Sequence, residues 1–203
     1  FFADVDPAAL GHKALAVNLS DLAAMGAAPL GFTLALALPP ERAADEAWLT
    51  AFAGGLFALA DAHACPLVGG DTTGGPLNLS ITIFGQVPAG QALRRDGARL
   101  GDELWVSGTL GDARLALLAL RGDITLSPDM LAIARQRLER PTPRLALGQA
   151  LRGIATSAID VSDGLTGDVG HILKASGVGA VVETESASDL VASCAGCTSA
   201  DAR

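Results

Sequence analysis

Apolar residues in the first half of the chain follow two different spacings. Helical spacing predicts one helix from Pro7 to about Met25 and a second helix from Asp45 to Ala62. Apolar runs and alternating apolar and polar positions predict strands at residues 31–39, 66–70 and 77–87. This helix–strand–helix–strand–strand order belongs to the α/β or α+β class and is less regular than a doubly wound sheet.

The second half of the chain also alternates between the two patterns. Residues 88–103 are rich in Pro, Gly and charge, which predicts a linker and places domains at residues 1–90 and 91–203. Beyond the linker, strands are predicted at residues 103–108, in the first part of 155–165, and at 179–184. Helices are predicted near residues 112–120, at 130–138, after the prolines of 140–143, and at 165–175.

Composition limits the class of protein and its location. The chain has 203 residues, of which 50% are hydrophobic and 18% are charged, as in globular proteins. The net charge of −8 argues against a nucleic-acid partner, and the lack of an apolar run of about 18 residues predicts no membrane span. Three cysteines do not form a disulfide framework, so we expect a cytoplasmic protein. Because the sequence begins with Phe1 and residues 190–203 form no recognisable element, we expect a piece of a longer chain.

Asp21 is the first acid of interest, in the stretch "VNLSDLAAMG" of the first predicted helix. Nearly all of its neighbours are apolar, so we expect this helix to be largely buried, and a buried carboxylate needs a partner or a metal ion. Asn18, three residues earlier, is expected on a neighbouring position of the same face. Alternatively, Asp21 lies on an exposed stripe of the helix or caps a neighbouring loop.

Asp71 is the second, in "LVGGDTTGG", where an apolar run meets four glycines. Glycine lets backbone N–H groups approach an anion closely, and a carboxylate beside them suggests a phosphate bridged by a metal ion. The same residues are typical of a hairpin turn between two strands. Both interpretations remain open.

The stretch "IDVSDGL" carries Asp160, Ser162 and Asp163 between a predicted strand and a predicted helix. Ligands collect at the carboxyl ends of strands in open α/β sheets, which favours a functional role. Ser162 or Asp163 could instead cap the helix, whereas Asp160 lies too early for capping.

The remaining chemistry-bearing groups are less specific. Arg94, Arg95 and Arg99 lie in the linker, where they suit a phosphate or are simply solvated. Cys194 and Cys197 form a Cys-x-x-Cys without a second pair, and their role stays open. The sequence contains no P-loop, no G-x-G-x-x-G and no H-E-x-x-H, and no nucleophile–base pair can be read from it. Dispersed carboxylates at glycine-rich loops are typical of a site in which several Mg²⁺ ions hold a polyphosphate.

These segments, taken in order, closely resemble thiamine-monophosphate kinases of the aminoimidazole ribonucleotide synthetase superfamily. The resemblance rests on "KALAVNLSDLAAMGA", "LVGGDTT", "RRDGARLGD" and "SAIDVSDGL", and it runs from about Phe1 to about Val182. It implies two α/β domains, with the N-terminal domains of two chains pairing into a β-barrel. It also implies direct transfer of a phosphoryl group from ATP to thiamine monophosphate, without a covalent protein nucleophile.

The resemblance assigns roles to particular residues. Asp21, Asp71, Asp160 and Asp163 match Mg²⁺ ligands, and Gly70, Asp71, Arg95 and Ser162 match ATP contacts. Substrate contacts are expected outside this sequence, so the chain by itself is expected to be inactive. Two alternatives remain: another ATP-using member, such as a hydrogenase maturation factor or a selenophosphate or purine-pathway synthetase, and a non-catalytic nucleotide-binding module.

Overall fold

The computed structural model describes residues 5–183, and its contacts divide the chain into two units. Unit 1 consists of Phe1–Leu93 and Glu139–Ala155, and unit 2 consists of Arg94–Leu138 and Thr156–Arg203. The return of Glu139–Ala155 to unit 1 was not expected from the sequence. The domain division at residue 90 stays a prediction, and Cys194 and Cys197 lie outside the described residues.

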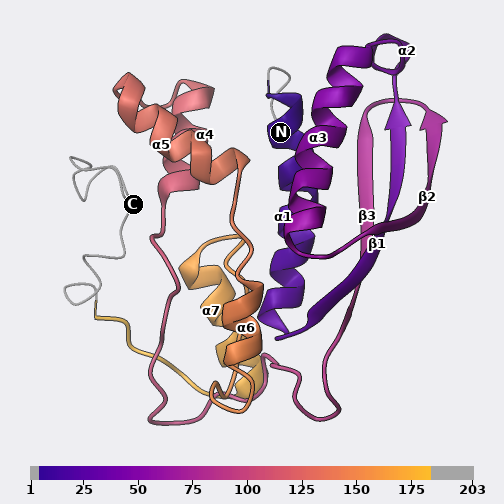
Figure 1. Cartoon of the computed structure of the whole chain (residues 1–203). Coiled ribbons are helices and arrows are strands. Elements are labelled where there is room, and N and C mark those ends of the chain that lie inside the picture. Colours follow the sequence, from indigo (N-terminus) through magenta and orange to yellow (C-terminus); the bar gives the residue numbers. More distant parts are fainter. Residues whose placement is uncertain (1–4, 184–203) are drawn as a thin grey trace. The chain divides into compact units, whose positions relative to one another are not determined.

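Unit 1 is built on a sheet of three strands with the order β2-β1-β3 (Figure 1). The strands are β1 (Ala28–Leu38), β2 (Leu67–Gly74) and β3 (Asn78–Gln86). β1 pairs in parallel with β2 and antiparallel with β3. The three strands predicted for this half are therefore confirmed, but β2 continues through the "GGDTT" residues, which were expected to form a loop or a turn.

Two long helices, α1 (Pro7–Ala24) and α3 (Glu46–Ala62), pack together on one face of this sheet (Figure 1). Asp6 caps α1 by accepting hydrogen bonds from two backbone N–H groups, and Pro7 occupies the first helical position, as predicted. The predicted apolar stripe of α3 is confirmed, because its members either lie in the core or pack against it: Trp48, Leu49, Phe52, Leu56, Leu59 and Ala60. Short helices α2 (Pro40–Ala43) and α6 (Leu145–Ala150) complete unit 1.

The crossing of α1 and α3 is unusually close because a glycine of each helix faces the other's backbone. A Cβ built on Gly55 would lie 1.9 Å from the carbonyl oxygen of Ala8, and one built on Gly11 would lie 2.1 Å from that of Phe52. No side chain larger than hydrogen fits at either position without movement of the backbone.

Unit 2 is helical in its described part, with α4 (Asp112–Arg121), α5 (Pro128–Glu139) and α7 (Leu165–Ser176). These helices were predicted, but the strands expected at 103–108, within 155–165 and at 179–183 are absent. A strand persists only where a neighbour accepts and donates its backbone hydrogen bonds, and the described part of unit 2 offers no such neighbour. Trp105 of the first of these segments is 83% exposed. In residues 5–183 no helix is both long and apolar enough to cross a membrane.

Candidate functional site

The residues that the sequence singles out are shared between the two units. Asp21, Gly70 and Asp71 belong to unit 1. Arg95, together with Asp160 and its neighbours Ser162 and Asp163, belongs to unit 2. The candidate residues therefore fall into two groups, one in each unit.

Asp21 lies near the end of α1, and its side chain is exposed. The helix around it is largely buried, as predicted, and of the two interpretations left open by the sequence, the one that places Asp21 on an exposed stripe of the helix is confirmed. The apolar neighbours face α3 and the sheet, and Asp21 occupies the remaining stripe. Asn18, three residues earlier, donates its side-chain amide to the backbone oxygen of Ala14, 2.8 Å away.

Asp71 lies in the middle of β2 and is exposed. It is in register with Ala35 of β1, which in turn is in register with Ser80 of β3. These three residues lie on the face of the sheet opposite the helices, because the next residue of β1, Leu36, is buried in the core. The backbone N–H of Thr72 donates to the Asp71 carboxylate over 2.9 Å.

Gly70 has a structural reason to be glycine that the sequence did not reveal. Its φ of +148° is one that other residues rarely adopt, and a Cβ at this position would lie 2.0 Å from the carbonyl oxygen of Leu34. The glycine thus lets β2 come close to β1, which in turn fixes the position of Asp71.

The described residues contain no preformed metal centre. Nowhere in residues 5–183 do three His, Cys, Asp or Glu side chains gather so that they could hold a metal ion. Asp21 belongs to a helix on the inner side of the sheet, and Asp71 points from its outer face. Unit 1 alone therefore does not bring these two carboxylates together.

In unit 2, the side chain of Asp168 holds the acidic loop before α7 by hydrogen bonds. This carboxylate is 3% exposed, and its Oδ2 atom accepts hydrogen bonds from the backbone N–H groups of Ser162 (2.9 Å), Asp163 (3.1 Å) and Gly164 (3.1 Å). Gly164 is the N-cap residue of α7, with no side-chain cap. The suggestion that Ser162 or Asp163 caps the helix is therefore wrong, and both side chains are exposed.

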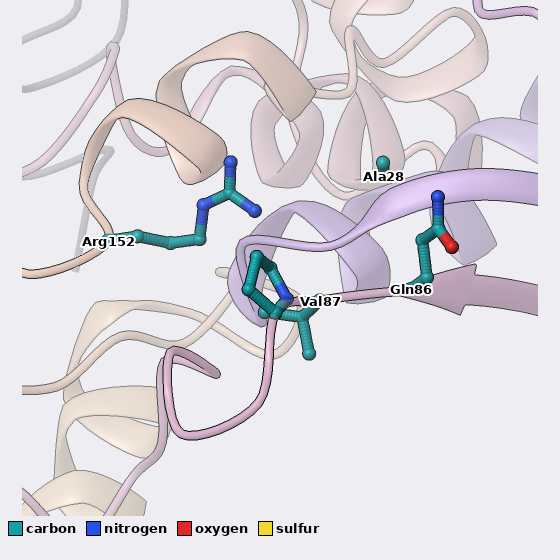
Figure 2. Close-up of a pocket in the computed structure, with 5 residues that line it drawn as sticks. Ala28, Gln86, Val87 and Arg152 are labelled. Atoms are coloured by element: carbon teal, nitrogen blue, oxygen red, sulfur yellow. The ribbon is translucent and has the colours of Figure 1, made fainter.

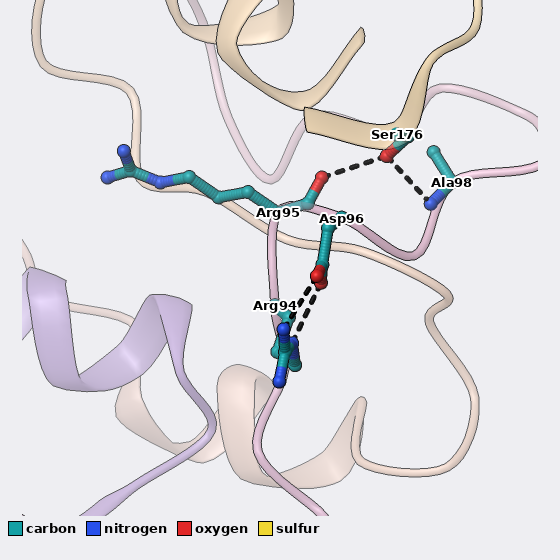
Figure 3. Close-up of polar contacts among 5 residues, drawn as sticks. All are labelled: Arg94, Arg95, Asp96, Ala98 and Ser176. Carbon is teal, nitrogen blue, oxygen red and sulfur yellow. Dashed lines mark hydrogen bonds and ion pairs between the residues drawn. The ribbon is translucent and has the colours of Figure 1, made fainter. Parts of the chain in front are cut away.

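The arginine pair of the linker divides into two roles (Figure 3). Arg94 forms a two-pronged ion pair with Asp96, with N···O distances of 2.8 and 2.6 Å, and this pair lowers the pKa of the Asp96 carboxyl. The Arg95 side chain extends away from that pair and is exposed. Its backbone carbonyl accepts a hydrogen bond from the Ser176 hydroxyl over 2.9 Å, which ties this segment to the end of α7.

The linker and the "SAIDVSDGL" segment lie side by side in unit 2. The backbone N–H of Ala158 donates to the carbonyl oxygen of Arg94 over 3.0 Å. A Cβ on Gly97 would lie 1.9 Å from the carbonyl oxygen of Thr156, so only glycine allows this approach. The Thr156 hydroxyl donates to Asp102 over 2.6 Å. Arg95 and Asp160 therefore belong to two segments that are joined directly.

A surface pocket of unit 1 lies apart from all of these residues. It is lined by Ala28, Gln86, Val87, Pro88 and Arg152 (Figure 2). None of the predicted site residues contributes to it. The Arg152 Nε atom donates to the carbonyl oxygen of Gln149, 3.1 Å away.

Comparison with known proteins decides the family. The family described as AIR synthase related protein, N-terminal domain, matches residues 1–87. Thiamine-monophosphate kinases of Salmonella typhimurium and Escherichia coli (strain K12) are 54% and 52% identical, over 91% and 90% of this chain. The crystal structure of thiamine-monophosphate kinase from Stenotrophomonas maltophilia K279a matches 87% of the chain, with 56% identity and a TM-score of 0.80. This chain belongs to the thiamine-monophosphate kinase family.

The match covers only part of these relatives. The chain spans about 56% of the length of the two kinases and 57% of the S. maltophilia chain. A structure of AaThiL complexed with AMPPCP and TMP shares 34% identity with it at a TM-score of 0.78, over 87% of this chain and 56% of that one. The AIR synthase-like fold expected from the sequence is confirmed, whereas the dimeric β-barrel stays a prediction.

Proposed function

We propose that this chain contributes to an enzyme that transfers the terminal phosphoryl group of ATP to thiamine monophosphate, giving thiamine diphosphate. The observation that carries the proposal is the identity with thiamine-monophosphate kinases over about nine-tenths of the chain. The relative complexed with AMPPCP and TMP supports a nucleotide and thiamine monophosphate as the two substrates. We place the enzyme in the cytoplasm, where both substrates are expected.

Arg95, Ser162 and Gly70 are the proposed nucleotide contacts. Arg95 suits this role because Arg94, and not Arg95, is paired with Asp96, and an Arg fork matches phosphate oxygens. Ser162 presents an exposed hydroxyl from the loop that Asp168 holds. Gly70 would allow close approach of the phosphates only at the exposed side of β2, because its other side faces Leu34.

The donor groups fit Mg²⁺ bound together with a nucleotide. Asp71, Asp160 and Asp163 offer hard carboxylate oxygens, and Mg²⁺ usually takes only one or two of these, with phosphate oxygens and waters completing its shell. The absence of a three-carboxylate cluster in the described residues agrees with such shared binding. When bound, Mg²⁺ neutralises charge on the phosphates. Asp21 is the fourth proposed ligand, from its exposed place on α1.

The acceptor explains why no nucleophile or general base is needed. A phosphate monoester is already negatively charged and attacks as it stands, so the obstacle is its repulsion by the triphosphate. Arg95 would offset part of this charge, and the loops that carry the acids would hold the two phosphates in line.

We also propose that two copies pair through the sheet of unit 1. β2 is an edge strand that is exposed along its whole length, and Val68 on it is 62% exposed. Exposed edges and apolar sheet faces are normally covered in folded proteins. Light scattering on the longest chain that the gene encodes should give the mass of a dimer, and a strict monomer would contradict the pairing.

The kinase assignment is tested by substitution in that same longest chain. We expect Asp71→Asn and Asp160→Asn each to lower kcat for thiamine monophosphate by about a hundredfold or more, as loss of a metal contact does. Asp61→Asn, at an exposed acid of α3, is the matched control and should leave kcat unchanged. Near-normal turnover of either variant at saturating Mg²⁺ would refute the ligand assignment.

A panel of substrates separates the kinase from its alternatives. Thiamine monophosphate should stimulate release of ADP from ATP, whereas selenide, purine-pathway precursors and hydrogenase-maturation substrates should not. Nucleotide binding without any turnover would identify a non-catalytic module instead.

A further inference from the structure

We propose that Asp168 is a positioning residue that holds the Asp160–Asp163 loop in the geometry needed to bind metal and nucleotide. The idea rests on the proposed function, because it assigns Asp168 to the same site. Asp168 itself was not predicted from the sequence and does not reach a ligand: its side chain is buried beneath the loop.

The geometry around Asp168 is specific. Three consecutive backbone N–H groups, those of Ser162, Asp163 and Gly164, converge on a single oxygen, Oδ2. Buried N–H groups and a buried carboxylate are both costly when unpaired, and here each satisfies the other. The carboxylate also lies in the first turn of α7, where the helix dipole favours negative charge.

This arrangement decides which way the loop faces. Because the N–H groups of Ser162 and Asp163 turn inward, the two side chains remain exposed. Within residues 5–183 no hydrogen bond or ion pair engages the carboxylates of Asp160 and Asp163. The loop thus presents the Asp163 carboxylate and the Ser162 hydroxyl to solvent, with Asp160 half-buried before them, while the buried Asp168 holds the loop from inside.

The same unit contains a second buried aspartate that makes a matched control. Asp112 is 2% exposed, accepts a hydrogen bond from the Thr109 hydroxyl at 2.7 Å and lies 3.9 Å from the Arg137 Nε atom. It joins α4 to α5 and makes none of the loop contacts that Asp168 makes. Removing it should destabilise unit 2 without releasing the loop.

The first experiment measures amide hydrogen exchange by NMR in the 203-residue chain. In Asp168→Ala we expect the amides of Ser162, Asp163 and Gly164 to exchange at least about tenfold faster than in the unmodified chain. Asp168→Asn should be intermediate, because one amide oxygen can still accept the three bonds. Asp112→Ala should leave these three amides unchanged relative to the rest of unit 2. Unchanged exchange of the three amides in Asp168→Ala would overturn the proposal.

The second experiment measures the Mg²⁺ concentration for half-maximal rate in the longest chain that the gene encodes. We expect Asp168→Ala to raise it by about tenfold or more and Asp168→Asn by less, with no change in Asp112→Ala. A faster-exchanging loop with an unchanged Mg²⁺ requirement would overturn the role in ligand binding. If the unmodified enzyme does not phosphorylate thiamine monophosphate, the proposed function fails, and amide exchange still decides whether Asp168 holds the loop.

Discussion

Two neighbouring glycines of α3 should respond in opposite ways to the same substitution. Gly55 is buried and faces α1, where an added Cβ would lie 1.9 Å from the carbonyl oxygen of Ala8. Gly54 is exposed, and an added Cβ there would meet nothing within 4 Å. We expect Gly55→Ala to destabilise unit 1 and Gly54→Ala to stabilise it.

The magnitude follows from the contact distance. Real Cβ atoms essentially never come closer than 3.0 Å to another heavy atom, so the gap of 1.9 Å at Gly55 has to widen by about 1.1 Å, the difference between the two. The obstacle is the backbone of α1, which cannot rotate away as a side chain can, so the penalty should reach the upper end of the range of about 1–3 kcal/mol for overpacking. Alanine gains about 1 kcal/mol of helix propensity at either position.

The difference between the two variants isolates the steric term, because both gain the same propensity. Urea unfolding of the chain, followed by circular dichroism, should place Gly54→Ala about 0.5–1 kcal/mol above the unmodified chain. Gly55→Ala should lie about 2 kcal/mol below it, for a difference of about 3 kcal/mol between the variants. A difference under about 1 kcal/mol would show that the helices separate easily, and the argument from close packing would be wrong. Gly11→Ala, which meets the backbone of Phe52, should behave like Gly55→Ala.

Two further predictions concern charge. The Thr156 hydroxyl and the Arg99 backbone N–H lower the pKa of the Asp102 carboxyl, so the stability that these hydrogen bonds give is present above the ordinary carboxyl pKa and is lost as the pH falls through the lowered pKa. Carboxyl NMR titration should show a higher pKa of Asp102 in Thr156→Val, and an unchanged pKa would contradict the assignment. The described residues hold no three-carboxylate cluster, so we expect Mn²⁺ and a non-hydrolysable ATP analogue each to bind weakly alone to the longest chain that the gene encodes. Together they should bind at least about tenfold more tightly, by reciprocal coupling. Calorimetry that finds the same Mn²⁺ affinity with and without nucleotide would refute shared binding.

The fold of unit 1 could be predicted because its local signals agree with its packing. The Asp6–Pro7 start of α1 and the apolar stripe of α3 are each sufficient to specify a helix. From residue 78 to residue 83, β3 alternates between polar residues on the outer side and Leu79, Ile81 and Ile83 on the core side. The close approach of Gly11 to the backbone of Phe52, and of Gly55 to that of Ala8, gave no such signal, because isolated glycines in a helix follow no recognisable pattern.

The strand predictions for unit 2 were wrong for a physical reason. A short apolar run such as "ELWVSG" specifies a strand only when another strand is available to pair with it, and this information is not local. The helices α4 and α7 need no such partner for their backbone hydrogen bonds, since each satisfies them within itself. Prediction was therefore reliable for the helices and poor for the segments between them.

For the candidate site, the sequence singled out candidate residues but not what each of them contacts. The apolar neighbours of Asp21 left a buried and an exposed carboxylate both open, because they describe only the other sides of its helix. In the sequence, Arg94 and Arg95 are equivalent candidates for binding phosphate, whereas in the structure Arg94 is paired with Asp96. Asp168 had a detectable signal, an acid in the first turn of a helix, but such acids are common, and nothing local shows that this one reaches back to three backbone N–H groups.

Among the acids of residues 5–183, some make structural contacts, whereas Asp71 and Asp163 are proposed to bind metal. For example, Asp6 caps α1, Asp96 pairs with Arg94, Asp102 accepts a hydrogen bond from Thr156, and Asp168 holds the loop before α7. The positions of Asp71 and Asp163 are set by the course of the backbone. Gly70 brings β2 against β1 and so sets Asp71 on the outer face of the sheet, and the loop over Asp168 turns Asp163 outward. In a protein of net charge −8, further exposed carboxylates add repulsion, and we propose that a bound cation offsets this repulsion at Asp71 and Asp163.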